Sequence, residues 1–512
     1  MIINKPFESF DPIFNFKSDA FKNGVDSLCE PLCDLIKAFI VHGHIPDIFL
    51  VCSLIPIIKD KRSSSLSSEN YRLIAITSLI LKLFDGILLE LYGNSLKPSP
   101  QQFGFQRGQS TTMATWTLKE TISYFTNRGS PIYLCLLDLT KAFDHVKFSE
   151  LFTLLKDRIP HILIRFVIFS YTHQQCRVVW QNSSSSIFDI AKGSIASPTY
   201  FNLYVDPIFK KLQDSNMGCW IGDIYFGALG YADDMALLAP SRGTLQKMVG
   251  MCESFFNQVG IKVSTNPVAK KSKTVCISFG TKFVPEPLVL YGNRLPFVSQ
   301  HKHLGHIVHE DESSKHDMQI RLNELVAKFH SLRQQVGRQD PIVILTLVNT
   351  YLCSLYGSSL WDLSAVESME VDKTWNSIVR SAFELPINTH RHIVEHLNGG
   401  KHIRHSVLKR FKNFYHQLAA CDKEAVHHLM RLQEYDDRSI FGRNCSYVKS
   451  RLAVQRIQDA AIDSIPSYIV PDGCGWKLQI ISEVMDHKRG LLTIGDLTAQ
   501  EATMILNNLC SN

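Results

Sequence analysis

The sequence lacks long apolar stretches, and its glycines, prolines and cysteines are few for its length. Its 512 residues include 27 Gly, 20 Pro and 13 Cys, which excludes collagen-like, low-complexity and disulfide-scaffold proteins. The most apolar segment, Leu73–Leu81, is followed by Lys82 and Asp85, well short of the ~20 apolar residues that span a membrane. The N-terminus also lacks the apolar region of a secretory signal. We therefore expect an intracellular protein, in the nucleus or the cytoplasm, without a membrane segment.

Neither positive nor negative charge is in large excess. Lys and Arg number 54 against 48 Asp and Glu, a net charge of +6, and 45% of the residues are hydrophobic. This apolar content excludes intrinsic disorder and predicts a globular chain with two or three subdomains. A mildly basic charge permits a polyanionic partner but does not require one.

The hydrophobic pattern divides the chain into two parts. Strand-like and helix-like patterns alternate through residues 1–300, whereas residues 315–460 are helical in pattern almost throughout. The serine-rich, charged segment Lys59–Glu69 predicts an exposed loop. We therefore predict an α/β part followed by an α part.

Helix starts are marked by capping residues. Thr77 or Ser78, then Ser110, and then Ser197 each precede a helical pattern. Pro198 follows Ser197, at the position where proline best suits a first helical turn. The face of this last helix that we expect to be buried carries Phe201, Tyr204, Val205, Ile208 and Leu212.

Acidic residues stand at the ends of two otherwise apolar strand patterns. The run Ile132–Leu137 predicts a buried strand that ends on Asp138, and two later apolar runs predict a hairpin with Asp233 and Asp234 at its turn. Carboxylates crowded at one sheet edge repel until a divalent cation lies between them. Two Mg²⁺ ions about 4 Å apart, bridged by such acids, would serve phosphoryl displacement.

Each acidic site also has an ordinary structural interpretation. Asp233 and Asp234 alone are typical turn residues, and Asp138 alone is typical of a helix N-cap. Their occurrence together, with a helix between them, favours a shared sheet edge. A metal site for nucleotidyl transfer is therefore our preferred interpretation.

Three segments carry a family resemblance. LLDLTKAFDHV, AKGSIASPTYFNLYVD and YADDMALLA, in this order and spacing, resemble the palm motifs of reverse transcriptases, and the wording is most similar to non-LTR, LINE-type retrotransposons. NYRLIAITSLILKLFDGIL and QQFGFQRGQSTTMA resemble the flanking fingers and non-LTR segments. HKHLGHIV resembles the primer-grip region, and YLCSLYGSSLW resembles the thumb of CR1-like elements.

The resemblance implies a right-hand polymerase of the α/β (α+β) class. Its fingers would span residues 1–130, and its palm, an antiparallel sheet flanked by helices, residues 131–310. A helical thumb would follow over residues 311–385, and then a helical C-terminal extension of unknown role over residues 386–512. Such elements place an endonuclease before the polymerase, so the short segment ahead of the fingers suggests a fragment or truncated copy.

The resemblance also assigns site residues. It implies that Asp138, Asp233 and Asp234 hold two Mg²⁺ ions, or Mn²⁺ in their place, and are catalytic. Lys59 and Arg72 match positions that contact the incoming triphosphate, although surface cations are usually only solvated.

Phe143 matches an aromatic residue that crowds the sugar 2′ position, and the alternative is an ordinary core aromatic. Lys192 and Gly193 match the loop under the nucleotide, where the family commonly has Gln in place of the lysine. His303 also replaces a common Tyr. Lys271 and Lys273 follow Asn266 at unusual spacing, which leaves the proton-donating lysine of the family unassigned.

A later helix pattern is both apolar and basic. Basic residues Lys401, Arg404, Lys409 and Lys412 lie largely off an apolar stripe, so the helix either tracks a phosphate backbone or only keeps the surface soluble. The stripe is formed by Ile403, Val407, Phe411, Phe414 and Leu418.

Two functions remain open. The first is an RNA-directed DNA polymerase that binds an RNA template, a DNA primer or target DNA, and deoxynucleoside triphosphates. The second is a decayed copy that binds nucleic acid without turnover. The intact acidic triad favours the first, whereas Lys192, His303 and the missing endonuclease favour the second.

Overall fold

The computed structural model describes most of the chain between residues 10 and 461 in two units. The described residues are 10–11, 16–17 and 23–461, except 60–63, 141, 182, 190–195, 266–272, 338, 354, 365–367 and 399–402. The first unit comprises Met1–Arg107, Cys135–Val275 and Pro287–Pro296, and the second comprises Gly108–Leu134, Cys276–Glu286 and Phe297–Asn512.

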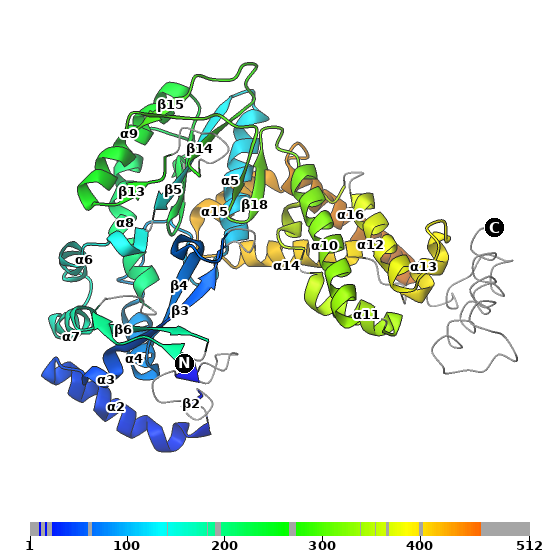
Figure 1. The fold of residues 1–512 in the computed structure, drawn as a ribbon. Coiled ribbons are helices and arrows are strands. Elements are labelled where there is room, and N and C mark those ends of the chain that lie inside the picture. Colours follow the sequence, from blue (N-terminus) through cyan, green and yellow to red (C-terminus); the bar gives the residue numbers. More distant parts are fainter. Residues whose placement is uncertain are drawn as a thin grey trace, which may run out of the picture. The chain divides into compact units, whose positions relative to one another are not determined.

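The first unit is a mixed α/β structure in which helices flank the sheets (Figure 1). Its helices are α2 (Val25–His42), α3 (Asp47–Leu50), α4 (Leu79–Tyr92), α6 (Phe148–Leu155), α7 (His161–Thr172), α8 (Ser197–Asp214) and α9 (Arg242–Val259), with 3-10 turns η1 (Ser68–Asn70) and η2 (Ala142–His145). The expected α/β class of this part of the chain is confirmed.

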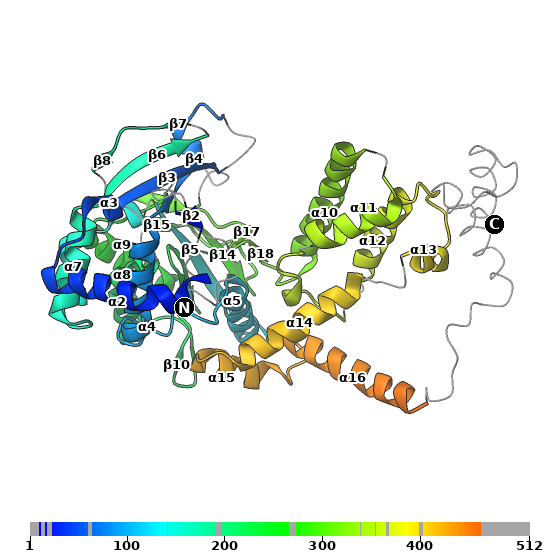
Figure 2. The same cartoon turned by 90° about the horizontal axis from the view of Figure 1, so that it is seen from below.

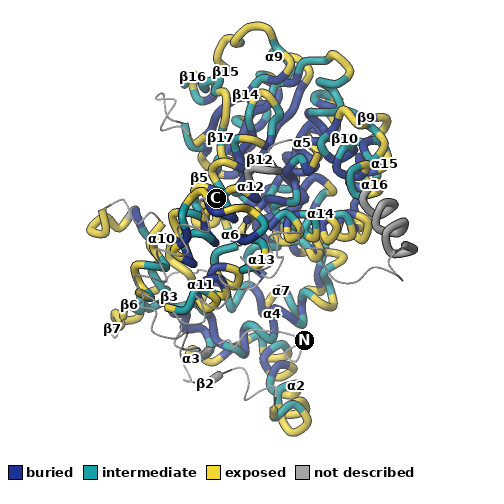
Figure 3. Tube along the Cα trace, turned by 90° about the vertical axis from the view of Figure 1, so that its right-hand side faces the viewer, coloured by how far each residue is buried: buried dark blue, intermediate teal, exposed yellow. Residues whose placement is uncertain are grey.

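The strand that carries Asp138 lies inside a five-stranded sheet. The strand order is β11-β12-β5-β13, and β14 also pairs with β5. β12 is almost wholly buried, and Figure 3 shows it in dark blue. The strands are β5 (Ile132–Thr140), β11 (Ala228–Tyr231), β12 (Asp234–Ala239), β13 (Lys262–Val263) and β14 (Val275–Phe279).

A second sheet of the first unit has the order β4-β3-β6-β7, with β8 paired to β6. β3 is antiparallel to β4 and parallel to β6, and the three strands lie side by side in Figure 2. β6 and β8 pair as antiparallel strands on either side of the serines at 183–186, with Cys176 opposite Phe188. These strands are β3 (Val51–Ile58), β4 (Tyr71–Ile76), β6 (Gln175–Trp180), β7 (Ser183–Ser184) and β8 (Phe188–Asp189).

Short two-stranded pairs complete the strand inventory. They are β1 (Phe10–Asp11) with β2 (Phe16–Lys17), β9 (Trp220–Ile221) with β10 (Ile224–Tyr225), β15 (Leu288–Leu290) with β16 (Asn293–Leu295), and β17 (Gln300–His303) with β18 (His306–His309).

The second unit is mainly helical, as the sequence predicts. Its helices are α5 (Thr111–Thr126), α10 (Lys315–Val336), α11 (Pro341–Leu347), α12 (Ser368–Ala382), α13 (Arg391–Leu397), α14 (Ile403–Ala419), α15 (Glu424–Gln433) and α16 (Ile440–Ala461), with short turns η4 (Val348–Leu352) and η5 (Ser358–Leu360). The predicted apolar stripe of α14 is buried at all five positions.

Two of the three predicted helix caps are present. The Ser78 hydroxyl accepts a hydrogen bond from Leu81 N, and the Ser110 hydroxyl accepts one from Met113 N. The third prediction is wrong, because Ala196 is the N-cap of α8 and Ser197 is already helical. The Ser197 hydroxyl instead contacts the Tyr171 hydroxyl at 2.9 Å. The Ser197 side chain, which local rules assign to capping, therefore makes a tertiary contact between α7 and α8 instead.

Candidate metal and nucleotide site

The β11–β12 hairpin presents two adjacent carboxylates. Tyr231 pairs with Asp234 across the hairpin, and Asp233 lies in the turn between them. Ala232 has a φ of 56°, a left-handed conformation that tight turns require and that non-glycine residues adopt at some cost. The predicted hairpin with acids at its turn is confirmed.

Asp138 lies within β5, two residues before the strand ends. The sequence predicts that the strand ends on Asp138, whereas Leu139 and Thr140 continue it by pairing with Val263 and Lys262 of β13. The Asp138 amide N donates to the Thr274 hydroxyl at 3.2 Å. Strand β12 is the neighbour of β5 in the sheet, so the acids from the two strands share one region, as the sequence predicts.

The charges of neighbouring carboxylates affect the ionisation of Asp233 and Asp234. Burial, followed by the charges of Asp233 and Asp138, raises the pKa of Asp234 from 3.8 to about 7. Burial and the Asp138 charge also raise the pKa of Asp233, although its backbone hydrogen bond and the charges of Arg72 and Lys273 oppose them. The site therefore concentrates negative charge in a poorly solvated place.

One lysine partly offsets this charge. Burial raises the pKa of Asp138, and Lys273 opposes that rise, with its Nζ 3.8 Å from Asp138 Oδ2. The Lys273 side chain is 73% exposed, so its charge is well screened by water. Lys271, the other lysine of this segment, lies outside the described residues.

The donor set suits a hard divalent cation. All three side chains offer only carboxylate oxygens, the ligands that Mg²⁺ and Mn²⁺ prefer. A divalent ion bound there would offset the carboxylate charges that, after burial, raise the pKa values of Asp233 and Asp234. The residues therefore fit the metal that the sequence predicts.

Gln102, a residue to which the sequence motifs assign no role, supports the acidic turn. Its buried side-chain Oε1 accepts hydrogen bonds from Ala232 N at 2.9 Å and from Gly104 N at 3.0 Å. The neighbouring Phe103 N donates to Gly230 O at 2.7 Å. The QQFGF segment is thus bonded directly to the hairpin that carries Asp233. Its position within a recognised motif was the available signal.

Gly104 is required by close packing in the same place. A Cβ at Gly104 would lie 2.4 Å from Ala232 N, closer than a real Cβ contact allows. Its carbonyl accepts from the Asn202 amide at 2.7 Å, which ties the segment to α8. The backbone can therefore approach the turn only without a side chain at this position.

Lys59 and Arg72 lie at one end of the β3–β4 hairpin. Ile57 pairs with Arg72, and Lys59 N donates to Asn70 O at 2.7 Å. Both side chains are exposed. The charge of Arg72 lowers the pKa of Asp233, so the structure connects this cation with the acidic site.

Phe143 follows β5 in the short turn η2 and is not a typical core residue. Its side chain is 42% exposed. The ring stacks on buried Phe201 of α8, with centroids 4.4 Å apart and planes at 28°. The exposed part of the ring is available to a ligand.

Several predicted positions cannot be placed or take another role. Lys192 and Gly193 lie outside the described residues. His303 is buried in β17, where it pairs with His306 of β18. Burial, followed by the charge of His301, lowers the pKa of His303 to about 4, so this residue is neutral at physiological pH.

Comparison with known families matches the segment that contains this site. Residues 58–308 match the family described as reverse transcriptase (RNA-dependent DNA polymerase). This segment is a reverse transcriptase domain. It includes all three aspartates, Lys59 and Arg72.

The reverse transcriptase domain is of the non-LTR retrotransposon type. The chain is 23% identical over 292 residues to a Pol polyprotein from a type-1 R2 retrotransposable element of Nasonia vitripennis, covering 56% of this chain and 28% of that protein. It is 25% identical over 227 residues to the R2DM Pol polyprotein of Drosophila melanogaster, covering 43% and 20%. The chain thus spans less than a third of the length of these two relatives.

Solved structures with some similarity include telomerases. The apo telomerase of Candida tropicalis has 15% identity and a TM-score of 0.33, covering 48% of this chain and 53% of that one. The Candida albicans telomerase in complex with a telomeric RNA fragment has 10% identity and a TM-score of 0.32, covering 78% and 68%.

Within the residues that the structure describes, no helix combines the length and the apolar character needed to cross a bilayer.

Proposed function

We propose that this chain is an active RNA-directed DNA polymerase that adds deoxynucleotides to a DNA 3′ end on an RNA template. The observation that carries this proposal is the cluster of Asp138, Asp233 and Asp234. Burial raises the pKa of all three carboxyls, and neighbouring carboxylate charges further raise those of Asp233 and Asp234. Two Mg²⁺ ions held by these carboxylates would activate the attacking oxygen and stabilise the leaving one. Mn²⁺ could replace them.

The remaining residues of the site would bind and select the nucleotide. Lys59 and Arg72 would contact the triphosphate, where fixed cations offset phosphate charge. Phe143 would contact the sugar and exclude a 2′-hydroxyl, supported on its other face by Phe201. Lys192 and Gly193 would lie under the nucleotide, an assignment that rests on sequence resemblance alone.

The polymerase would have the right-hand organisation. Fingers would span residues 1–130, palm residues 131–310, thumb residues 311–385, and a C-terminal extension residues 386–512. An RNA template, a DNA primer or target DNA, and deoxynucleoside triphosphates would be its partners in the nucleus or the cytoplasm. The similarity of YLCSLYGSSLW to CR1-like elements supports a CR1-like origin.

The alternative is a decayed copy that binds nucleic acid without turnover. Two departures from the family favour it. Lys192 cannot offer the hydrogen-bond acceptor that Gln provides, and His303 is buried and paired within a hairpin, where the family commonly has Tyr.

Primer extension separates the two functions. Purified protein is given an RNA template with an annealed DNA primer, the four deoxynucleotides and Mg²⁺, and binding to the same hybrid is measured in parallel. We expect extension by the wild type and none by Asp138→Asn, Asp233→Asn or Asp234→Asn, because each removes a metal-binding charge with little change of volume. Exposed Asp223, in the turn between β9 and β10, provides the control Asp223→Asn. Binding without extension by the wild type would select the decayed copy.

A further inference from the structure

A second group of metal-binding side chains lies in the helical unit, apart from the three aspartates in sequence. It consists of His309 at the end of β18, Asp311 in the following turn and His316 in the first turn of α10. Their ligand atoms all lie within 4.8 Å of one another. His309 Nδ1 is 2.8 Å from Asp311 Oδ1, and His316 Nε2 is 3.2 Å from Asp311 Oδ2.

The backbone around this group holds the three side chains in place. Ser313 N donates to Asp311 Oδ1 at 2.8 Å, which orients the carboxylate. Buried Asp317 of α10 accepts a hydrogen bond from Ile307 N of β18 at 3.2 Å and another from Trp361 Nε1 at 2.9 Å. The strand that carries His309 is therefore tied to the helix that carries His316. Such outer contacts are what metal sites use to fix their ligands.

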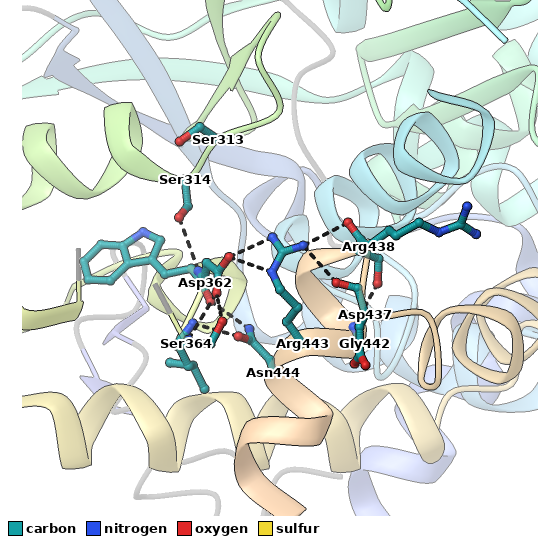
Figure 4. A network of polar contacts seen from close by, with 12 residues as sticks. Ser313, Ser314, Asp362, Ser364, Asp437, Arg438, Gly442, Arg443 and Asn444 are labelled. Carbon is teal, nitrogen blue, oxygen red and sulfur yellow. Dashed lines mark hydrogen bonds and ion pairs between the residues drawn. The ribbon is translucent and has the colours of Figure 1, made fainter. Parts of the chain in front are cut away.

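A polar network supports the same turn from the other side. Asp362 N donates to the Ser314 hydroxyl at 3.2 Å. Arg443 of α16 donates to Asp362 Oδ2 at 2.7 and 2.9 Å, and Asn444 accepts from Leu363 N at 2.7 Å (Figure 4). The turn that contains Asp311 is thus anchored at its C-terminal end.

The two imidazole rings lie face to face beside the Asp311 carboxylate. They stack with centroids 3.7 Å apart and planes at 10°, and Asp311 N donates to His309 Nδ1 at 3.2 Å. An imidazole nitrogen binds a metal through the lone pair in the plane of its ring. Both rings would therefore turn towards an ion that they share.

We propose that His309, Asp311 and His316 bind one zinc ion. Two imidazoles and one carboxylate are ligands that suit Zn²⁺, whereas Mg²⁺ prefers oxygen ligands alone. Bonds of about 2.0–2.2 Å to a tetrahedral ion place ligand atoms roughly 3.4 Å apart. The spacing of the three ligand atoms suits one ion once the two stacked rings have turned towards it.

The ion would close the turn between β18 and α10 and leave one position for water or a solute. His309 and Asp311 also line a cavity of about 360 Å³ in the same unit, together with Trp116, Glu120 and Phe441. Asp311 is exposed, which gives an ion a path of entry. This site does not depend on the proposed polymerase activity.

The test measures zinc binding in a background without the three aspartates. The full chain carrying Asp138→Asn, Asp233→Asn and Asp234→Asn is freed of metal with a chelator and titrated with Zn²⁺ against a chromophoric chelator. We expect one equivalent of tight binding, and visible absorption of tetrahedral type when Co²⁺ is used. Zn²⁺ should also raise the melting temperature.

Two ligand variants and one matched control complete the design. His316→Ala and Asp311→Asn should each weaken zinc binding by at least about tenfold. His330→Ala, which removes an exposed imidazole from the same helix, should bind as tightly as its parent. Melting curves without metal identify a variant that has failed to fold. If His316→Ala does not fold, the zinc affinity of Asp311→Asn, which keeps the side-chain volume, tests the proposal. The proposal is overturned if the parent binds no zinc or if folded ligand variants bind it unchanged.

Discussion

Replacing Asp234 by Asn should stabilise the metal-free protein while abolishing polymerisation. The wild-type carboxylate is held in a place where burial and the charges of Asp233 and Asp138 oppose its ionisation, which raises its pKa from 3.8 to about 7. The amide of Asn carries no charge and has nearly the same volume. The variant therefore loses the repulsion together with the metal ligand.

The size and the pH range of this effect follow from the pKa. The difference between 3.8 and about 7, at about 1.36 kcal/mol per pKa unit, corresponds to an upper bound of roughly 4 kcal/mol. Water penetration and relaxation reduce it, so we expect about 1–2 kcal/mol, or a rise in melting temperature of about 2–8 °C. Because the folded pKa of Asp234 is raised, its favourable contribution is complete below about pH 4 and is lost as pH rises through about 7. The advantage of the variant should therefore be clearly smaller at pH 5 than at pH 8, where it is nearly full.

Thermal melting with and without Mg²⁺ tests this reasoning. In chelator, Asp234→Asn should melt above the wild type at pH 8, and Asp223→Asn should melt with the wild type. Saturating Mg²⁺ should raise the wild-type melting temperature more than that of the variant, because the ion neutralises the same carboxylates. If Asp234→Asn melts at or below the wild type at pH 8 in chelator, the account of mutual repulsion is wrong.

Three further predictions concern nucleotide selection, support of the catalytic turn and nucleic-acid binding. Phe143→Ala should raise the ratio of ribonucleotide to deoxynucleotide incorporation by about 10–200-fold. Phe148→Ala, an aromatic control on α6, should leave that ratio unchanged. If Phe143→Ala loses stability while the ratio stays constant, Phe143 is a packing residue only. Gln102→Leu should slow primer extension at saturating nucleotide and lower the free energy of unfolding by about 1–3 kcal/mol, because two buried amides lose their acceptor. If the variant extends primers at the wild-type rate, Gln102 does not support the catalytic turn. Affinity for the primer–template should fall as salt rises from about 50 to 200 mM. If α14 contacts phosphate, the double variant Lys409→Gln with Lys412→Gln should make affinity depend less steeply on salt. An unchanged dependence would mean that these lysines only keep the surface soluble.

Local patterns predicted the elements that depend on neighbours in sequence. The caps at Ser78 and Ser110, the β11–β12 hairpin and the buried stripe of α14 all agree with the structure. Each depends on spacing within a few residues, where backbone hydrogen bonds and side-chain periodicity act directly. The prediction that the strand ends at Asp138 is wrong, because pairing with β13, far along the chain, extends β5 by two residues.

The acidic site could be predicted from sequence because apolar strands and acidic ends are visible without a fold. The residues that support it could not be predicted, because their contacts join segments far apart in the chain. Gln102 reaches Ala232 across 130 positions, and Ser197 gives up its capping role for a contact with Tyr171.

The sequence by itself determined the α/β part, the helical part and the identity of the acidic triad, because periodicity and charge are local properties. Only the tertiary structure decided which side chains meet. The raised pKa of Asp234 comes from burial and neighbouring charges, and the geometry of His309, Asp311 and His316 comes from the pinning of β18 to α10 through Asp317. Both depend on distances between side chains, and these are set when separate elements pack together.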